Sequence, residues 1–236
     1  MQTEPKLIHE TLAAQPVPSS ALSAQHKVLR NTYLLLALSL IPTVIGATIG
    51  SNIDLSFMRS SPILSFMAVL AIFYGWIYAI ERNRDSALGV GLLLGFTLFL
   101  GLLLGPLLQR VLGLANGVEL VMLAAGGTAA VFFAMAGIAS SSKRDFSGMG
   151  NFLMIGAIVI MLAVVANLFL ASPVFHLVIL AAFIIFSSMI ILFQVNAIVR
   201  GGETNYISAT LTLYIAIYNI FSSLLQLLGI GGSSSD

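Results

Sequence analysis

The sequence predicts an all-α, polytopic membrane protein that crosses the bilayer with seven helices. Hydrophobic residues make up 58% of its 236 positions, and charged residues make up only 8%. A soluble domain usually carries about 25% charged residues, so this chain could not cover a water-facing surface. The apolar residues form long runs that are separated by short polar, glycine-containing or proline-containing stretches. Together these observations predict a bundle of transmembrane helices with lipid as its main solvent.

Seven apolar runs are long enough to span a membrane. A helix that crosses a hydrocarbon core of ~30 Å needs roughly 20 apolar residues. In chain order, the runs cover residues 33–50, 62–80, 87–108, 118–139, 150–170, 174–199 and 206–230. Membrane-spanning strands would instead be about ten residues long with alternating polarity, a pattern that these continuous runs lack.

Each run is bounded by residues that interrupt an apolar helix. In chain order, the interrupting segments are 51–61, 81–86, 109–117, 140–149, 171–173 and 200–205. The shortest of them is Ala171-Ser172-Pro173, which predicts a tight hairpin between the fifth and sixth helices. Pro106 lies within the third run and is expected to end or kink that helix, because proline has no backbone N–H.

The chain is predicted to form one membrane domain at residues 31–230. A flexible polar tail precedes it at residues 1–30, where residues 23–30 could begin an interfacial helix, and a short tail follows at 231–236. If the N-terminus is cytoplasmic, eight of the ten lysine and arginine residues lie on the cytoplasmic side. They are Lys6, Lys27, Arg30, Arg82, Arg84, Lys143, Arg144 and Arg200, against Arg59 and Arg110 outside. The positive-inside rule therefore predicts a cytoplasmic N-terminus and a C-terminus on the opposite face.

Pairs of glycines four residues apart predict close contacts between helices. Such spacing places both glycines on one helix face, so that another helix can approach closely. The pairs are Gly46 and Gly50, Gly91 and Gly95, and Gly101 and Gly105. We expect these faces to meet neighbouring helices.

The sequence argues against an enzyme. No charged residue lies near the centre of any run, although an ionisable residue there would by default be a functional candidate. The absence of cysteine excludes thiolate chemistry, and a net charge of +1 gives no basic field for nucleic acid. His176 could face Ser222 or Ser223, but no Gly-x-Ser-x-Gly turn or paired carboxylates support a hydrolase. We expect no catalytic residue, no cofactor and no metal.

Neutral polar residues gather in the last two runs and form the candidate polar cluster. Its members are Gln194, Asn196, Tyr214, Ala216, Tyr218 and Asn219, with Ala216 included because it shares a helix stripe with Asn219. One interpretation is interhelical hydrogen bonding that fixes the packing, worth about 1 kcal/mol per contact. The alternative is a polar lumen around the last helix. The pattern by itself is compatible with both.

Several segments resemble the Bax-inhibitor family of seven-helix membrane proteins. The motif of Gly101, Gly105 and Pro106 resembles a signature of that family. Further similar segments are 26–33, 126–133, 201–207 and 213–221, which resemble the family's bacterial YccA branch. The resemblance implies a bundle in which the last helix is central and six others surround it. It also implies a location in the bacterial inner membrane.

The resemblance implies two functions of different classes. Some family members are pH-sensitive calcium leak channels that use two aspartates, and the matching positions here are Gln194 and Ala216. Neither side chain can ionise, so the acidic pair that would share a proton is absent. An arginine found in the second helix of some leak-forming relatives also has no counterpart in residues 62–80.

The YccA branch is associated instead with FtsH, a membrane-anchored AAA protease. Members there resemble modulators that restrain its attack on other membrane proteins. An AAA protease grips an unstructured segment, and a tail of 30 residues reaches ~30 Å as a coil. The resemblance therefore implies a non-enzymatic FtsH modulator. The alternatives are an ion leak and a general stress-protective membrane protein.

Overall fold

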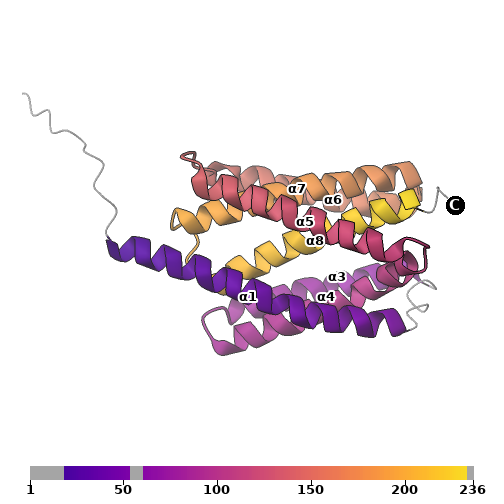
Figure 1. Ribbon diagram of the computed structural model, residues 1–236, viewed down its shortest axis with the longest axis horizontal. Coiled ribbons are helices and arrows are strands. Elements are labelled where there is room, and N and C mark those ends of the chain that lie inside the picture. Colours follow the sequence, from indigo (N-terminus) through magenta and orange to yellow (C-terminus); the bar gives the residue numbers. More distant parts are fainter. Residues whose placement is uncertain (1–18, 54–60, 233–236) are drawn as a thin grey trace, which may run out of the picture.

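The computed structural model describes residues 19–53 and 61–232 (Figure 1). Its elements are α1 (Ser19–Asn52), α3 (Pro62–Arg82), α4 (Ala87–Leu112), α5 (Gly117–Ser141), the 3-10 turn η1 (Ser147–Met149), α6 (Gly150–Leu170), α7 (Pro173–Val199) and α8 (Tyr206–Gly232). Seven helices are long and apolar enough to cross a membrane, and the described ranges contain no strand. The predicted all-α membrane fold is confirmed.

Helices α1 and α4 extend furthest beyond the predicted runs. Helix α1 begins at Ser19, so residues 19–30, which the sequence analysis placed in the tail, are helical, whereas residues 1–18 lie outside the described part. Helix α4 continues through Pro106 to Leu112, so an end at the proline is wrong, whereas the alternative of a kink there stays a prediction. Proline cannot donate to the carbonyl of Leu102, four residues earlier. That carbonyl lies instead against Gly50 of α1.

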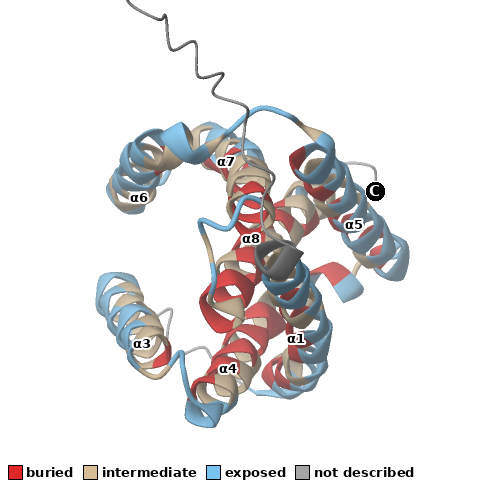
Figure 2. Ribbon diagram, turned by 90° about the vertical axis from the view of Figure 1, so that its left-hand side faces the viewer, coloured by how far each residue is buried: buried red, intermediate tan, exposed pale blue. Residues whose placement is uncertain are grey.

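The helices pack around two main contacts (Figure 2). Helix α1 lies along α4, and α8 packs against α7, α5, α1, α4 and, less extensively, α3. Helix α3 otherwise packs on α4, whereas α6 packs on α7 and η1. A complete ring of six helices around the last one therefore stays a prediction.

The core follows the buried faces of α8, α7 and α4. Leu213, Ala216 and Ile220 of α8 are fully buried, as are Leu93 and Phe96 of α4. Helices α3 and α6, by contrast, contain few buried residues, and Figure 2 shows their ribbons almost entirely in the blue of exposed and the tan of half-buried positions. This exposure is expected where lipid rather than water surrounds the protein.

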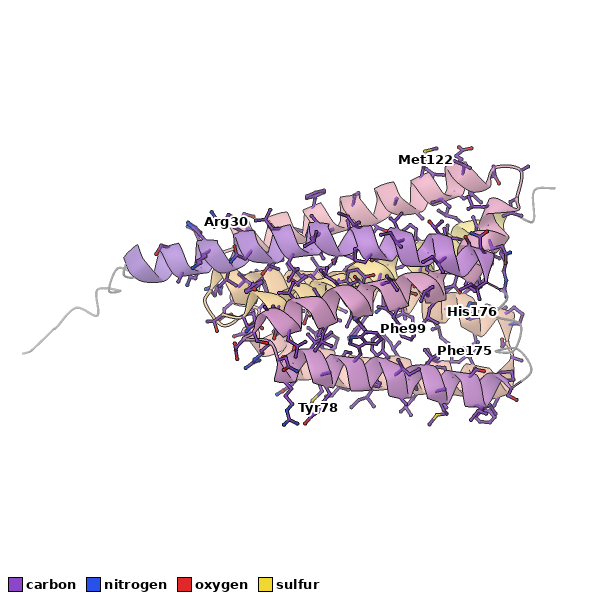
Figure 3. All side chains as sticks on the ribbon, turned by 90° about the horizontal axis from the view of Figure 1, so that it is seen from below. Arg30, Tyr78, Phe99, Met122, Phe175 and His176 are labelled. Carbon is purple, nitrogen blue, oxygen red and sulfur yellow. The ribbon has the colours of Figure 1, made fainter. Side chains whose placement is uncertain are left out.

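One end of the bundle carries nearly all of the positive charge, and we call it the basic end. It contains the start of α1, the connections α3–α4, α5–α6 and α7–α8, and every described lysine and arginine except Arg110. Figure 3 shows Arg30 at this end of the bundle and His176 near the opposite end. The distribution is the one that the positive-inside rule describes.

Hydrogen bonds join the connections at the basic end. The hydroxyl of Ser208 donates to Oε2 of Glu81 at 2.9 Å, linking α8 to α3. Asn205 Nδ2 donates to Oδ1 of Asp85 at 2.8 Å. Gly201 has φ +78° and lies beneath the side chain of Gln25, so a left-handed backbone position is covered by α1. These contacts join the start of α8 and the connection before it to α3, to the α3–α4 connection and to α1.

Candidate functional site

The motif that contains Gly101 and Gly105 forms the contact between α4 and α1. A Cβ atom on Gly101 would collide with the carbonyl oxygen of Thr43, and one on Gly105 would collide with the backbone at Gly50. Gly46 and Gly50 of α1 meet the carbonyl oxygens of Leu98 and Leu102 in the same way. Two of the three predicted glycine pairs therefore face each other at backbone contact, a geometry that permits Cα–H···O contacts between helices.

The third glycine pair has a different environment. Gly91 has no neighbouring atom within 4 Å of a Cβ placed on it, so the prediction of a helix contact is wrong there. A Cβ atom placed on Gly95 would lie 3.1 Å from the ring of Trp76. The Trp76 indole N–H donates to the carbonyl of Leu92 at 2.9 Å, and its ring stacks on Phe99. This tryptophan holds α3 against α4.

Tyr214 connects the buried centre of α8 to α1. Its hydroxyl lies 2.6 Å from Oγ1 of Thr43, which itself donates to the carbonyl of Ser39 at 2.7 Å. The same hydroxyl lies 3.4 Å from the carbonyl oxygen of Thr97 on α4. Tyr218 stacks on Tyr214, with ring centroids 6.4 Å apart. The two tyrosines therefore lie on the face of α8 that packs toward α1 and α4.

Asn196 joins the end of α7 to the connection between α5 and α6. Its Oδ1 accepts from the backbone N–H of Phe146 at 3.1 Å, while its Nδ2 donates to the carbonyls of Ala139 at 3.3 Å and Arg144 at 3.4 Å. Asn196 is only 2% exposed, so its own end of each bond is shielded from water. In the same connection, hydrogen bonds from the backbone and side chain of Ser147, aided by the charge of Arg200, hold the pKa of Asp145 below its usual value.

Gln194 and Ala216 have unlike surroundings. Gln194 is 6% exposed and its Nε2 donates to Oε2 of Glu203 at 3.5 Å, at the basic end. The other carboxylate oxygen of Glu203 accepts from the backbone N–H of Asn205 at 2.8 Å. Ala216 is completely buried among apolar neighbours. A carboxylate does lie beside Gln194, but it belongs to the connection before α8.

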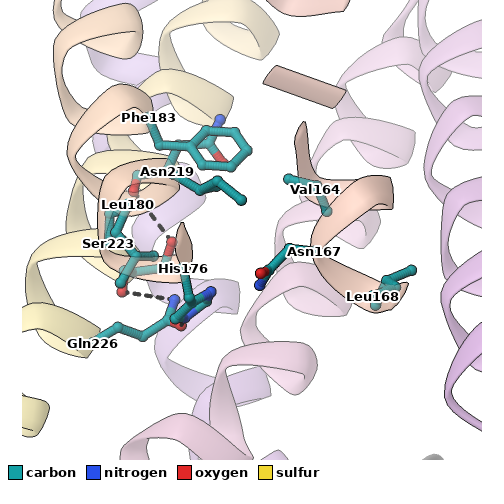
Figure 4. Close-up of a pocket in the computed structure, with 11 residues that line it drawn as sticks. Val164, Asn167, Leu168, His176, Leu180, Phe183, Asn219, Ser223 and Gln226 are labelled. Atoms are coloured by element: carbon teal, nitrogen blue, oxygen red, sulfur yellow. Dashed lines mark hydrogen bonds between the residues drawn. The ribbon is translucent and has the colours of Figure 1, made fainter. Parts of the chain in front are cut away.

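Asn219 lines a pocket of about 260 Å³ between α6, α7 and α8. Figure 4 shows its side chain on the α8 wall, across from Asn167 of α6. Nε2 of His176 lies 3.2 Å from Oε1 of Gln226, so this histidine pairs with the glutamine. The hydroxyl of Ser222 donates to the carbonyl of Asn219 at 3.3 Å. The pocket thus places His176 beside neutral amides, an arrangement suited to hydrogen bonding.

Metal ligation receives no support from the described ranges. They contain no group of three or more His, Cys, Asp or Glu side chains placed to hold a metal ion.

The polar members of the candidate polar cluster are divided among three neighbourhoods: the basic end, the α8–α1 contact and the pocket. Its members therefore meet different helices, and their shared role in a functional site stays a prediction.

Comparisons with known proteins identify the family. A family profile described as inhibitor of apoptosis-promoting Bax1 matches residues 25–233. The chain belongs to the Bax-inhibitor family. Gly101 and Gly105, two residues of the motif that resembled this family in sequence, lie at backbone contact with α1.

Bacterial members of the Bax-inhibitor family match almost the whole chain. The Modulator of FtsH protease YccA of Escherichia coli K12 is 41% identical over 210 residues, or 89% of this chain and 93% of that protein. An uncharacterized protein of Neisseria meningitidis serogroup A is 47% identical over 87% of this chain and 91% of its own length. One from Pseudomonas aeruginosa is 40% identical over 91% and 95% of the two chains. Together with the seven apolar helices, a relative named inner membrane protein YccA supports a multi-pass inner-membrane protein.

The sequence analysis missed the polar groups of α1 and α4 that contact α8. Thr43 precedes Gly46 by three residues and Thr97 precedes Gly101 by four, so each threonine lies on the face of its glycine pair. That spacing was the available signal. The carboxylates of Glu81 and Glu203 gave no such signal, because their partners Ser208 and Gln194 come from other elements.

Replacing Tyr214 by phenylalanine is expected to lower stability by about 0.5–1.5 kcal/mol, the usual net value of one buried hydrogen bond. A double-mutant cycle with Thr43→Val should assign about 0.6 kcal/mol, and no more than about 1.7, to the pair itself. Thermal unfolding in detergent measures both. Tyr74→Phe is the matched control, because Tyr74 is 54% exposed. Additive effects of the two changes would show that the Thr43–Tyr214 bond does not contribute.

Proposed function

We propose that this protein is a non-enzymatic inner-membrane modulator that binds an FtsH-type AAA protease and protects other membrane proteins from degradation. The proposal is carried by the 41% identity to the Modulator of FtsH protease YccA of Escherichia coli. Because that identity extends over 89% of this chain and 93% of the relative, it covers the helix bundle and its connections rather than a single motif.

The arrangement of the basic end supports a cytoplasmic contact with the protease. By the positive-inside rule, the basic end lies at the cytoplasmic face. Helix α1 starts at this end and projects beyond the other helices (Figure 1). The polar segment 1–18 precedes it, so the sequence predicts a tail on the side where an AAA protease engages unstructured chain. We propose that this segment contributes to binding.

The test measures the half-life of an unassembled membrane subunit that FtsH degrades. The assay uses Escherichia coli cells that lack their own YccA and express the full chain, a variant without residues 2–18, or no modulator. The full chain is expected to lengthen the half-life and to co-purify with the protease. The truncation stops before Ser19, because removing residues up to 30 would also delete the first turns of α1.

A variant with residues 2–18 replaced by a glycine–serine segment of equal length separates tail sequence from tail length. If neither the full chain nor any variant changes the half-life or captures the protease, the modulator function is wrong. The calcium-leak alternative would then be tested by flux into liposomes. If the variant without residues 2–18 lengthens the half-life as much as the full chain, the modulator function stands, but the tail is not the contact with the protease.

A further inference from the structure

The pocket between α6, α7 and α8 has one wall that is more polar than the others (Figure 4). Asn219, Ser222, Ser223 and Gln226 line it from α8. Val164, Leu168 and Phe183 are among the apolar residues that line it from α6 and α7. No charged side chain lines the pocket, so an occupant would meet hydrogen-bonding groups and hydrocarbon rather than a formal charge.

Asn167 leaves an unmet hydrogen-bonding group beside this pocket. Its Oδ1 is buried and has no hydrogen-bond partner among the described residues. Two side chains of α8 already have partners, since Gln226 donates to the carbonyl of Ser222 at 3.2 Å and pairs with His176, and Ser222 donates to the carbonyl of Asn219. A buried acceptor without a donor is costly, and more so on a helix otherwise rich in apolar residues. The unmet requirement is therefore a hydrogen-bond donor that faces Asn167.

The depth of the pocket indicates where that donor comes from. Asn167 lies in the last turn of α6 and His176 in the first turn of α7, each about 5 Å from its helix end at 1.5 Å per residue. For Asn167 this is the edge of the hydrocarbon core, next to the polar interface, because the 21 residues of α6 span about 31 Å and the core is ~30 Å thick. Phe183 lies ten residues into α7, about 15 Å deep. On the α6 and α7 side of the pocket, Asn167 and His176 therefore lie nearer the interface than Phe183, and this order matches the polarity of a phospholipid.

We propose that this pocket binds one glycerophospholipid whose headgroup carries a hydrogen-bond donor. The donor is a hydroxyl or an ammonium group that bonds Oδ1 of Asn167, while one acyl chain lies along Val164, Leu168 and Phe183. Phosphatidylethanolamine and phosphatidylglycerol both have such a donor, whereas phosphatidylcholine has none. The lipid would connect α6, which packs on α7, to the polar wall of α8. The site does not depend on the proposed protease function.

Photolabelling of the full chain in phosphatidylcholine nanodiscs tests the site. Three probes carry the same diazirine-bearing acyl chain on an ethanolamine, glycerol or choline headgroup, and mass spectrometry locates the labelled residues. The ethanolamine probe, the glycerol probe or both should label the pocket about two to ten times more than the choline probe, the factor expected for one hydrogen bond. The headgroup of the probe that labels the pocket more strongly identifies the lipid. Equal labelling by all three probes would overturn the proposal.

Asn167→Leu provides the decisive variant. It removes an unpaired buried acceptor and keeps a similar volume, so the protein should unfold at the same temperature or higher. Pocket labelling by the preferred probe should nevertheless fall to the level of the choline probe. Ser187→Ala is the control, because Ser187 is also a buried, unpartnered polar residue, on α7 but outside the pocket lining. Unchanged labelling in Asn167→Leu would contradict the site.

Discussion

Gly105→Ala is expected to destabilise the protein by about 1–3 kcal/mol or more, the usual cost of overpacking a well-packed interior. The added methyl group would collide with the carbonyl carbon of Gly50 and the backbone nitrogen of Ser51. A side chain can rotate away from such a clash, whereas two helix backbones can only separate. Separation would also weaken the neighbouring contacts of Gly46 and Gly101 along the same interface. The effect should therefore exceed that of an ordinary small-to-large change in a core.

Gly91→Ala is the matched control because it makes the same change in the same helix. A Cβ at Gly91 has no neighbour within 4 Å, so only the helix preference remains, and alanine should stabilise by roughly 0.5–1 kcal/mol. Thermal unfolding in a mild detergent measures both variants. Opposite shifts in unfolding temperature are expected. If both shifts have the same sign and size, the α1–α4 backbone contact does not limit stability.

The spans and two of the glycine contacts were predictable because they depend on local properties. Length and apolarity are sufficient to recognise a membrane helix, and four-residue spacing is sufficient to place two glycines on one face. The spacing does not reveal what the face meets. Gly101 and Gly105 meet the backbone of α1, whereas Gly91, with the same spacing to Gly95, meets nothing. The difference arises from the tertiary arrangement.

The candidate polar cluster shows a similar limit. Gln194 and Asn196 are close in sequence, but two residues apart on a helix means a rotation of about 200°, so they face different neighbours. Gln194 meets Glu203, while Asn196 meets the α5–α6 connection. Tyr214 and Tyr218 are four residues apart and do stack. Sequence thus identifies polar residues within spans, but their partners come from connections that hydropathy does not place.

Asn196→Ala is the second change for which we expect a large effect, about 2–4 kcal/mol of lost stability. The substitution leaves the N–H of Phe146 and the carbonyls of Ala139 and Arg144 without their side-chain partner. Each buried group left unsatisfied costs about 1–3 kcal/mol, and water admitted at the membrane edge recovers part of the total. The loss is also local, because these bonds hold the α5–α6 connection onto α7. Hydrogen exchange at the Phe146 amide should therefore accelerate along with the fall in unfolding temperature.

Asn196→Asp separates the contribution of the hydrogen-bond donor from that of the size of the side chain. An aspartate still accepts from Phe146, but it presents a negative oxygen to the carbonyls of Ala139 and Arg144, where the asparagine had presented a donor. It should destabilise at least as much as alanine, although its shape is nearly that of asparagine. Asn151→Ala, on the exposed face of α6, is the control and should change stability by less than about 0.5 kcal/mol. A stable Asn196→Asp protein would show that donation to the two carbonyls is dispensable, and that packing together with acceptance from Phe146 is sufficient.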